Sequence, residues 1–235
     1  NLGQSLASGI LPNVKNAFMD DYFSAAITND NVLYTWGDSS LGHLGVKDPK
    51  SNTPGKVEFD NSDDVKTGVK TVSHNGLYTT AAVTDDGGLY VWGVDTVLGE
   101  SLGSYTDTPE KVMDNVKDAI CAGGSDTFVI ALKNDGNVCS FGSNDNGQLG
   151  NNAFYSVLPE NAVSILGNVK EISVHNRTCA AITNDNELYT WGRNYGGQVG
   201  NGKDDDCNKP VKILENVKSI SLGDGFSAAI TYDNE

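Results

Sequence analysis

Related segments recur through the 235 residues of this chain, and this repetition constrains the fold more than any other feature. The first copy reads Ser-Ala-Ala-Ile-Thr-Asn-Asp-Asn-Val-Leu-Tyr-Thr-Trp-Gly at 24–37, and its relatives end at Gly93, Gly142, Gly192 and, cut short, Glu235. A Val-Lys pair precedes each copy, at steps of 47 to 55 residues. Because a unit of this length cannot bury its apolar face alone, the copies must stack on their neighbours. We predict one continuous repeat array.

Each copy has the composition of four short strands joined by turns. The first strand alternates polar and apolar residues, as at 217–221, and the second carries paired alanines, as at 226–231. The third ends in an aromatic residue and glycine, as at 33–37, and a glycine-rich reversal such as 147–150 follows it. The fourth has a proline near its start, as at 109–112, and is therefore an edge strand.

Four antiparallel strands per copy, with an edge strand outermost, describe a blade of a β-propeller. We predict an all-β fold with four complete blades and a partial fifth, in a partial or split-closed ring, and almost no helix. A single domain is expected over 1–235. Its predicted parts are a partial blade strand at 1–11, blades at 14–59, 69–112, 116–165 and 169–214, and a partial blade at 217–235.

One large ring stands at the same place in the third strand of each complete copy. These residues are Trp36, Trp92, Phe141 and Trp191. A tryptophan row could serve as a stacking platform for bases or sugars, but its place inside a strand and the replacement by phenylalanine favour packing between sheets.

The charge of the chain limits its partners. The net charge is −15, and Arg177 and Arg193 are the only arginines, the residues best suited to forked contacts with phosphate. Nucleic acid and anionic membrane surfaces are therefore excluded as partners. The longest apolar runs, such as 128–132, are far shorter than the ~20 residues of a spanning helix, so no membrane insertion is expected.

No cofactor or metal is expected. Four cysteines stand singly, without a Cys-x-x-Cys pair or a histidine at zinc-like spacing, and are predicted to be buried or idle thiols. The acidic turns between the second and third strands lack the spacing and the closing glutamate of a calcium loop, so we predict hairpin turns there.

The Trp-Gly, Gly-Gln-Leu-Gly, proline and Ala-Ala-Ile-Thr elements recur in fixed order, and together they resemble the regulator-of-chromosome-condensation repeat. This resemblance implies a propeller that typically has seven blades. The family's Gly-x-x-His before the second strand is absent from every copy, as at 20–23 and 76–79. Either the chain is a fragment, or its first strand completes a split blade; in an open arc the exposed blade faces would invite self-association.

We expect a non-enzymatic module that binds a protein partner of unknown identity through loops on one propeller face. Antiparallel strands put the loops between first and second strands on the same face as those between third and fourth. From the first set the candidate binding residues are Asp21, Tyr22, Leu77, Tyr78, Asp126, Asn176, Arg177 and Asp224. From the second set they are Tyr105, Phe154, Tyr155 and Tyr195.

Other functions remain open. The array could be a structural segment of a secreted or surface protein, and its acidity and Asn/Asp-rich turns favour an extracellular or cell-surface location. The resemblance also implies roles as an inhibitor of a secreted enzyme such as a β-lactamase, as a nucleotide exchange factor, or as an ultraviolet-B photoreceptor. The exchange factors carry a basic tail and the photoreceptors have loop tryptophans, and both are missing here. An enzyme with a central pocket is disfavoured because His43, His74 and His175 fall in different copies.

Overall fold

A computed structural model describes residues 11–20, 22–46, 52–59, 68–94 and 105–233. These residues form β-strands, with short 3-10 turns at Ser40–Gly42 and Pro159–Asn161 and no α-helix among them. None of the described residues belongs to a helix long and apolar enough to cross a membrane. Asp21 and the predicted strand at 1–11, apart from Leu11, lie outside the described ranges.

Four sheets contain four antiparallel strands each, which pair in chain order in every sheet. Sheet 1 contains β1 (Val14–Met19), β2 (Phe23–Thr28), β3 (Leu33–Gly37) and β4 (Gly55–Lys56). Sheet 2 contains β5 (Val69–His74), β6 (Thr79–Thr84), β7 (Leu89–Val94) and β8 (Tyr105–Met113). Sheet 3 contains β9 (Val116–Ala122), β10 (Phe128–Lys133), β11 (Val138–Gly142) and β12 (Ser164–Leu166).

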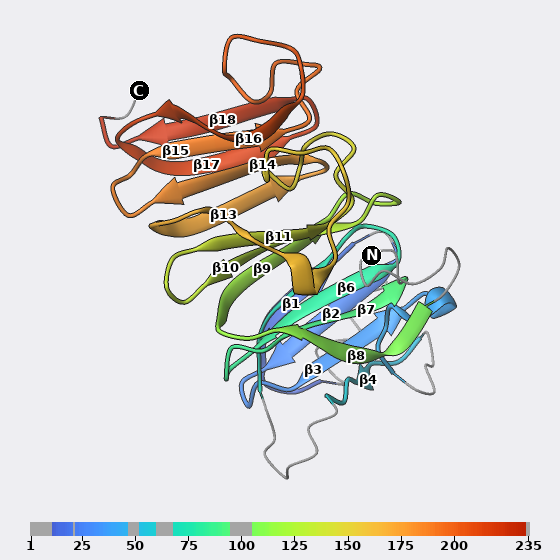
Figure 1. Cartoon of the computed structure of the whole chain (residues 1–235). Helices are drawn as coiled ribbons and strands as arrows, with labels where there is room; N and C mark the ends of the chain where they lie inside the picture. Colours follow the sequence, from blue (N-terminus) through green and yellow to red (C-terminus); the bar gives the residue numbers. More distant parts are fainter. Residues whose placement is uncertain (1–10, 21, 47–51, 60–67, 95–104, 234–235) are drawn as a thin grey trace.

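Sheet 4 contains β13 (Val169–His175), β14 (Thr178–Thr183), β15 (Leu188–Gly192) and β16 (Cys207–Leu214), and the two-stranded sheet 5 contains β17 (Val217–Gly223) and β18 (Phe226–Thr231). Figure 1 shows the sheets stacked in chain order, with sheets 1 and 5 at opposite ends and no strand of the described residues joining them. The predicted all-β class and sheet topology are confirmed. The assignment of one domain to 1–235 stays a prediction.

The core lies between sheets, and the first three interfaces each bury the third-strand aromatic side chain of the later sheet. Trp92 packs on sheet 1, Phe141 on sheet 2 and Trp191 on sheet 3, and each of these side chains is 0% exposed. The packing role predicted for these rings is confirmed. Trp36 is half-buried, because no described sheet precedes sheet 1.

A hydrogen bond joins each interfacial tryptophan to the glycine-rich loop of the preceding sheet. Trp92 Nε1 donates to the His43 carbonyl and Trp191 Nε1 to the Gln148 carbonyl, both at 2.9 Å. The loop glycine two residues after each carbonyl packs closely against the indole. A Cβ at Gly150 would come within 2.9 Å of Trp191 Nε1, so no larger residue fits there without a shift. The loop glycine of one copy and the tryptophan of the next therefore form one packing unit.

A second bond ties the same loop to its own third strand. A hydroxyl one residue before the aromatic position donates to a loop carbonyl. The pairs are Thr35 with Leu44, Ser140 with Leu149, and Thr190 with Val199, each at 2.6 Å. Sheet 2 has Val91 at this position, and it is also the copy whose loop lacks a complete Gly-x-Leu-Gly or Gly-x-Val-Gly sequence. Valine cannot donate this hydrogen bond, so the missing hydroxyl and the incomplete loop sequence occur in the same copy.

The outward face of sheet 5 is exposed. Phe226 and Ile230 in β18 are 62% and 53% exposed, whereas the matching Phe23 and Ile27 in β2 are 1% and 2% exposed under sheet 2. No described sheet covers this outward face of β18, whereas its other face packs on sheet 4. Self-association through this face stays a prediction.

Candidate protein-interaction face

The predicted binding residues lie at one end of the sheets. Because the strands in each sheet are antiparallel and pair in chain order, first-to-second and third-to-fourth loops leave the sheets at the same end. We call this end the loop face. Its described residues fall within 20–22, 75–78, 123–127, 176–177 and 224–225, and within 38–54, 143–163 and 193–206.

Exposed aromatic side chains are the main feature of the loop face. The exposed fractions are 68% for Tyr22, 39% for Tyr78, 55% for Tyr105, 50% for Phe154, 70% for Tyr155 and 62% for Tyr195. One prediction is corrected: Tyr105 is the first residue of β8 and not a loop residue, because the ladder with β7 extends to Val94. Its ring lies beside Gly42, where a Cβ would be 2.9 Å from Tyr105 Cδ2.

Two of the predicted charged residues bind each other. The Arg177 guanidinium in the loop of sheet 4 forms a salt bridge with Asp126 in the loop of sheet 3. The same guanidinium donates to Asn146 Oδ1 at 3.1 Å. These contacts brace the loops of neighbouring sheets against each other, so both charges are engaged within the chain.

The remaining predicted residues are dispersed. Leu77 is half-buried beside Gly124, whose added Cβ would lie 3.5 Å from Leu77 Cδ1. Asn176 occupies a turn with φ 53°, and Asp224 is exposed in the last turn. Asp21 lies outside the described residues. The structure therefore brings together Asp126 and Arg177 and spreads the others over successive sheets.

Two buried amides that the sequence analysis missed shape the largest loops. Asn194 is 0% exposed; its Nδ2 donates to the carbonyls of Lys203 and Asp205, and its Oδ1 accepts from the Val199 amide at 2.8 Å. Asn144 forms the matching set in sheet 3 and reaches the Tyr155 carbonyl at 3.1 Å. The available signal was an asparagine two residues after the third-strand glycine in both copies.

Replacing Asn194 by alanine is expected to loosen residues 195–206 and to lower the free energy of unfolding by about 1–3 kcal/mol, because buried carbonyls and an amide lose their partner. Amide hydrogen exchange should speed up in this loop while the third sheet keeps its protection. Asn201→Ala is the matched control: this half-exposed side chain accepts from the Lys203 amide and receives only the longest bond of Asn194, at 3.3 Å, so the variant leaves the Asn194 bonds to Val199, Lys203 and Asp205 in place. Equal exchange in the two variants would contradict the role given to Asn194.

Two histidines from different sheets meet beneath the loop face, although the sequence placed them in separate copies. The ring centroids of His43 and His74 are 5.5 Å apart, and the His74 ring stacks on Phe23 at 4.3 Å. Asp20 Oδ2 lies 3.6 Å from His74 Nδ1. Because the histidines are 0% and 7% exposed, no substrate can reach the pair.

The environment keeps these histidines neutral. Burial lowers the pKa of His43. Burial and then repulsion from His43 lower the pKa of His74 to about 4, against a smaller opposing effect of Asp20. His175 is exposed on a different sheet and does not join them.

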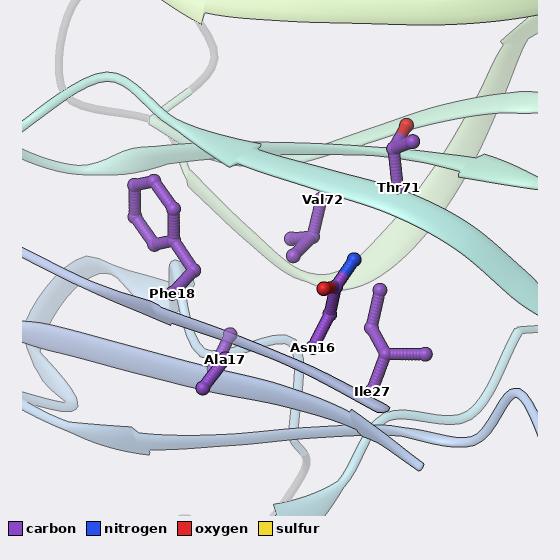
Figure 2. Close-up of a pocket in the computed structure, with 7 residues that line it drawn as sticks. Asn16, Ala17, Phe18, Ile27, Thr71 and Val72 are labelled. Atoms are coloured by element: carbon purple, nitrogen blue, oxygen red, sulfur yellow. The ribbon is translucent and has the colours of Figure 1, made fainter. Parts of the chain in front are cut away.

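A cavity of about 290 Å³ lies between sheets 1 and 2, beside their packed core. In Figure 2, Asn16, Phe18 and Ile27 from sheet 1 surround it opposite Thr71 and Val72 from β5. Its complete lining is Asn16, Ala17, Phe18, Ala25, Ile27, Thr71 and Val72. The lining includes no carboxylate, imidazole or thiol, so these side chains supply no acid–base pair.

All four cysteines are free thiols. Burial raises the pKa of Cys121 and Cys179 well above the usual range of a thiol, so they remain protonated and unreactive. Cys207 is half-exposed. Within the described ranges, no group of three histidine, cysteine, aspartate or glutamate side chains could hold a metal ion.

The family model described as "Regulator of chromosome condensation (RCC1) repeat" matches residues 135–182 and 185–230. Each match begins in the turn after a second strand and ends in the second strand of the next sheet, so it spans one interface between sheets. Of the recurring motifs, the Trp-Gly and Gly-Gln-Leu-Gly elements contribute contacts between successive sheets.

Curated relatives share these repeats. The ultraviolet-B receptor UVR8 of Arabidopsis thaliana is 31% identical over 206 residues, which cover 85% of this chain and 46% of that protein. The E3 ubiquitin-protein ligase HERC2 of Mus musculus is 32% identical over 185 residues, which cover 73% of this chain and 4% of that protein. The chain thus spans less than half the length of these relatives.

Solved structures show the same fold. Yeast RCC1 (Prp20), solved bound to Kap60, matches with a TM-score of 0.75 and 23% identity over 94% of this chain and 54% of that chain. Human WBSCR16 matches with a TM-score of 0.72 and 24% identity over 88% and 55%. The stacked sheets are blades of this type of propeller, as the sequence predicted.

Proposed function

The chain contains regulator-of-chromosome-condensation repeats, and from this premise we propose that it is a non-enzymatic module that binds a protein partner through its loop face. The observation that carries the proposal is the row of exposed aromatic side chains on that face, from Tyr22 in sheet 1 to Tyr195 in sheet 4. Aromatic residues dominate the energetics of protein interfaces, and loops on a rigid scaffold are the usual place for recognition.

The loops are held before any partner binds. Asn194 fixes the loop that presents Tyr195, and the Arg193 guanidinium lies 4.3 Å above the Tyr195 ring centroid. Asn144 does the same for the loop that presents Tyr155. Preorganised aromatic groups lose little freedom on binding. Because the chain is acidic, the matching partner has apolar pockets with basic rims.

Other roles have weaker support. An enzyme would need an accessible group of acids and bases, and the histidine pair of sheets 1 and 2 is buried. Ultraviolet-B reception, the role named for UVR8, has little support here. All three tryptophans of the chain lie on third strands, and none lies in a loop of the loop face. A scaffold segment of a surface protein and an inhibitor of a secreted enzyme remain alternatives, and an inhibitor would use the same loop face.

The test is a triple variant in which Tyr22, Tyr155 and Tyr195 become serine. These rings are 62–70% exposed, so the stability of the fold should change little. Arg177 is left intact because it braces two loops. Affinity capture from the source cells, quantified by mass spectrometry, should lose specific partners with this variant.

The matched control changes Val14, Leu214 and Tyr232 to serine. These side chains are also exposed, but they lie at the opposite end of the sheets, at the start of a first strand, the end of a fourth strand and the turn after a second strand. The control should capture the same proteins as the unmodified chain. An unchanged set with the loop-face triple would overturn the proposal.

A further inference from the structure

A lysine follows the opening valine of every first strand. These residues are Lys15, Lys70, Lys117, Lys170 and Lys218. They are a large share of the 16 lysines and arginines in a chain whose net charge is −15. A cation at the same place in every sheet therefore stands out against the acidic background.

Each of these lysines lies at an irregularity in its sheet. The register between first and second strands shifts between Val14 and Asn16, and equivalent shifts occur at the other four positions. The lysine is the extra residue of a β-bulge in each case. A bulge removes a residue from the regular pairing and redirects its side chain.

Two of the redirected side chains reach the next sheet. Lys70 Nζ donates to the Lys117 carbonyl at 2.9 Å, and Lys117 Nζ donates to the Lys170 carbonyl at 3.3 Å. Lys15 and Lys170 donate to the amide oxygens of Asn31 and Asn186 at 3.2 Å and 2.5 Å. Lys70 and Lys117 thus link sheets 2, 3 and 4, whereas Lys15 and Lys170 bond within their own sheets. We call the five lysines, one at the start of each first strand, the lysine arc.

The oxygen atoms that accept hydrogen bonds from Lys15, Lys70, Lys117 and Lys170 are neutral. Among the described residues, no salt bridge joins any of its lysines to a carboxylate, whereas Lys56, Lys111 and Lys212 on fourth strands each form one. A bond to a neutral oxygen does not itself neutralise the ammonium, although the Asp118 carboxylate is close enough to Lys70 and Lys117 to interact electrostatically with both. An ammonium also has three donors, so donors remain for a ligand.

Acidic groups do lie near the lysine arc. The Asp118 carboxylate accepts from the Ala119 amide, Asp85 accepts from Asn31 and Asp185 from Asn168, while Glu171 is exposed on β13. The three aspartates each accept a hydrogen bond from a neutral donor. They reduce the local positive potential, so binding to the lysine arc should be moderate in strength and sensitive to salt.

We propose that the lysine arc binds an extended acidic peptide segment of a partner protein. One ammonium per sheet along the stack fits a chain with spaced carboxylates better than a compact anion. Forked arginine contacts, which suit phosphate, are absent from the arc, and a long nucleic acid would meet the acidic remainder of the surface. The lysines begin the first strands, so this site lies at the end opposite the loop face and is independent of it.

The test uses a fluorescently labelled peptide of ten glutamates and measures its binding by anisotropy at low salt. In one variant Lys70, Lys117 and Lys170 become glutamine. In the matched control Lys56, Lys111 and Lys212 become glutamine, which changes the net charge equally but alters lysines already paired with carboxylates. The arc variant should bind about tenfold more weakly, since each exposed charge contact contributes roughly two- to threefold. The control should change by less than about twofold.

Three results would overturn the proposal: no binding of the glutamate peptide by the unmodified chain, equal losses in the two variants, or tighter binding of a ten-residue thymidine oligonucleotide. Circular dichroism establishes that each variant is folded. If the triple variant fails to fold, Lys117→Gln alone replaces it. That single variant should weaken binding by about two- to threefold, and an unchanged affinity would refute the role of the arc.

Discussion

Replacing Trp191 by alanine is expected to lower the free energy of unfolding by about 3–5 kcal/mol. The side chain is 0% exposed between sheets 3 and 4, so its removal leaves a cavity among Phe128, Ile130 and Leu149. The Gln148 carbonyl also loses the indole donor at 2.9 Å.

Urea unfolding followed by circular dichroism measures this change. Trp36→Ala is the matched control, because Trp36 has the same place in its strand but is half-buried, on a face of sheet 1 that no described sheet covers. It should destabilise the chain by much less than Trp191→Ala. Similar losses in the two variants would contradict the conclusion that the third-strand aromatic stabilises the fold through the preceding sheet.

Acidification from pH 7 to pH 4 is expected to lower the free energy of unfolding by roughly 3 kcal/mol through the interacting histidine pair, chiefly His74. Its pKa is about 4 in the folded chain and 6.5 in an unfolded one. The unfolded chain therefore binds more protons between these values, and stability falls as the pH drops from about 6.5 to about 4. His43 acts in the same direction, because burial lowers its pKa too.

The histidine pair can be removed without opening the interface. His43→Gln introduces the residue that the chain has at the matching loop positions, Gln148 and Gln198, and His74→Phe keeps a ring stacked on Phe23. The double variant should lose clearly less stability between pH 7 and pH 4, as measured by urea unfolding. His175→Gln, which changes an exposed histidine, should behave like the unmodified chain. An unchanged acid loss in the double variant would refute the role of the pair.

Much of the fold was predictable from local signals. Paired alanines and alternating residues marked the second and first strands, and Asn, Asp and Gly marked the hairpin turns, because backbone conformation in these segments depends on nearby residues. The aromatic position of the third strand was assigned to packing from its regular recurrence, and Trp92 and Trp191 are buried. The sequence also predicted that the first-to-second and third-to-fourth loops share one face, because antiparallel strands that pair in chain order place both loops at the same end of a sheet.

The details of the candidate site were not predictable in the same way. The salt bridge between Asp126 and Arg177 joins residues of different copies, so their separation in sequence gave no sign of the contact. His43 and His74 likewise meet only because sheet 2 packs on sheet 1. The sequence placed Tyr105 in a loop because the proline suggested that the fourth strand begins near residue 109. The β7–β8 ladder in fact begins at Tyr105. Asn144 and Asn194 had a sequence signal, but their burial depends on how the loops fold around them.

The sequence by itself determined the repeat, the strand order and the residues that face a neighbouring copy, since these depend on periodicity and turn chemistry within about fifty residues. Only the tertiary structure decided which side chains of successive copies touch: the buried histidines, the Arg177 brace and the lysine arc. Stacking brings together residues that lie about one repeat apart. The geometry of that stacking depends on packing across whole interfaces, which no local pattern contains.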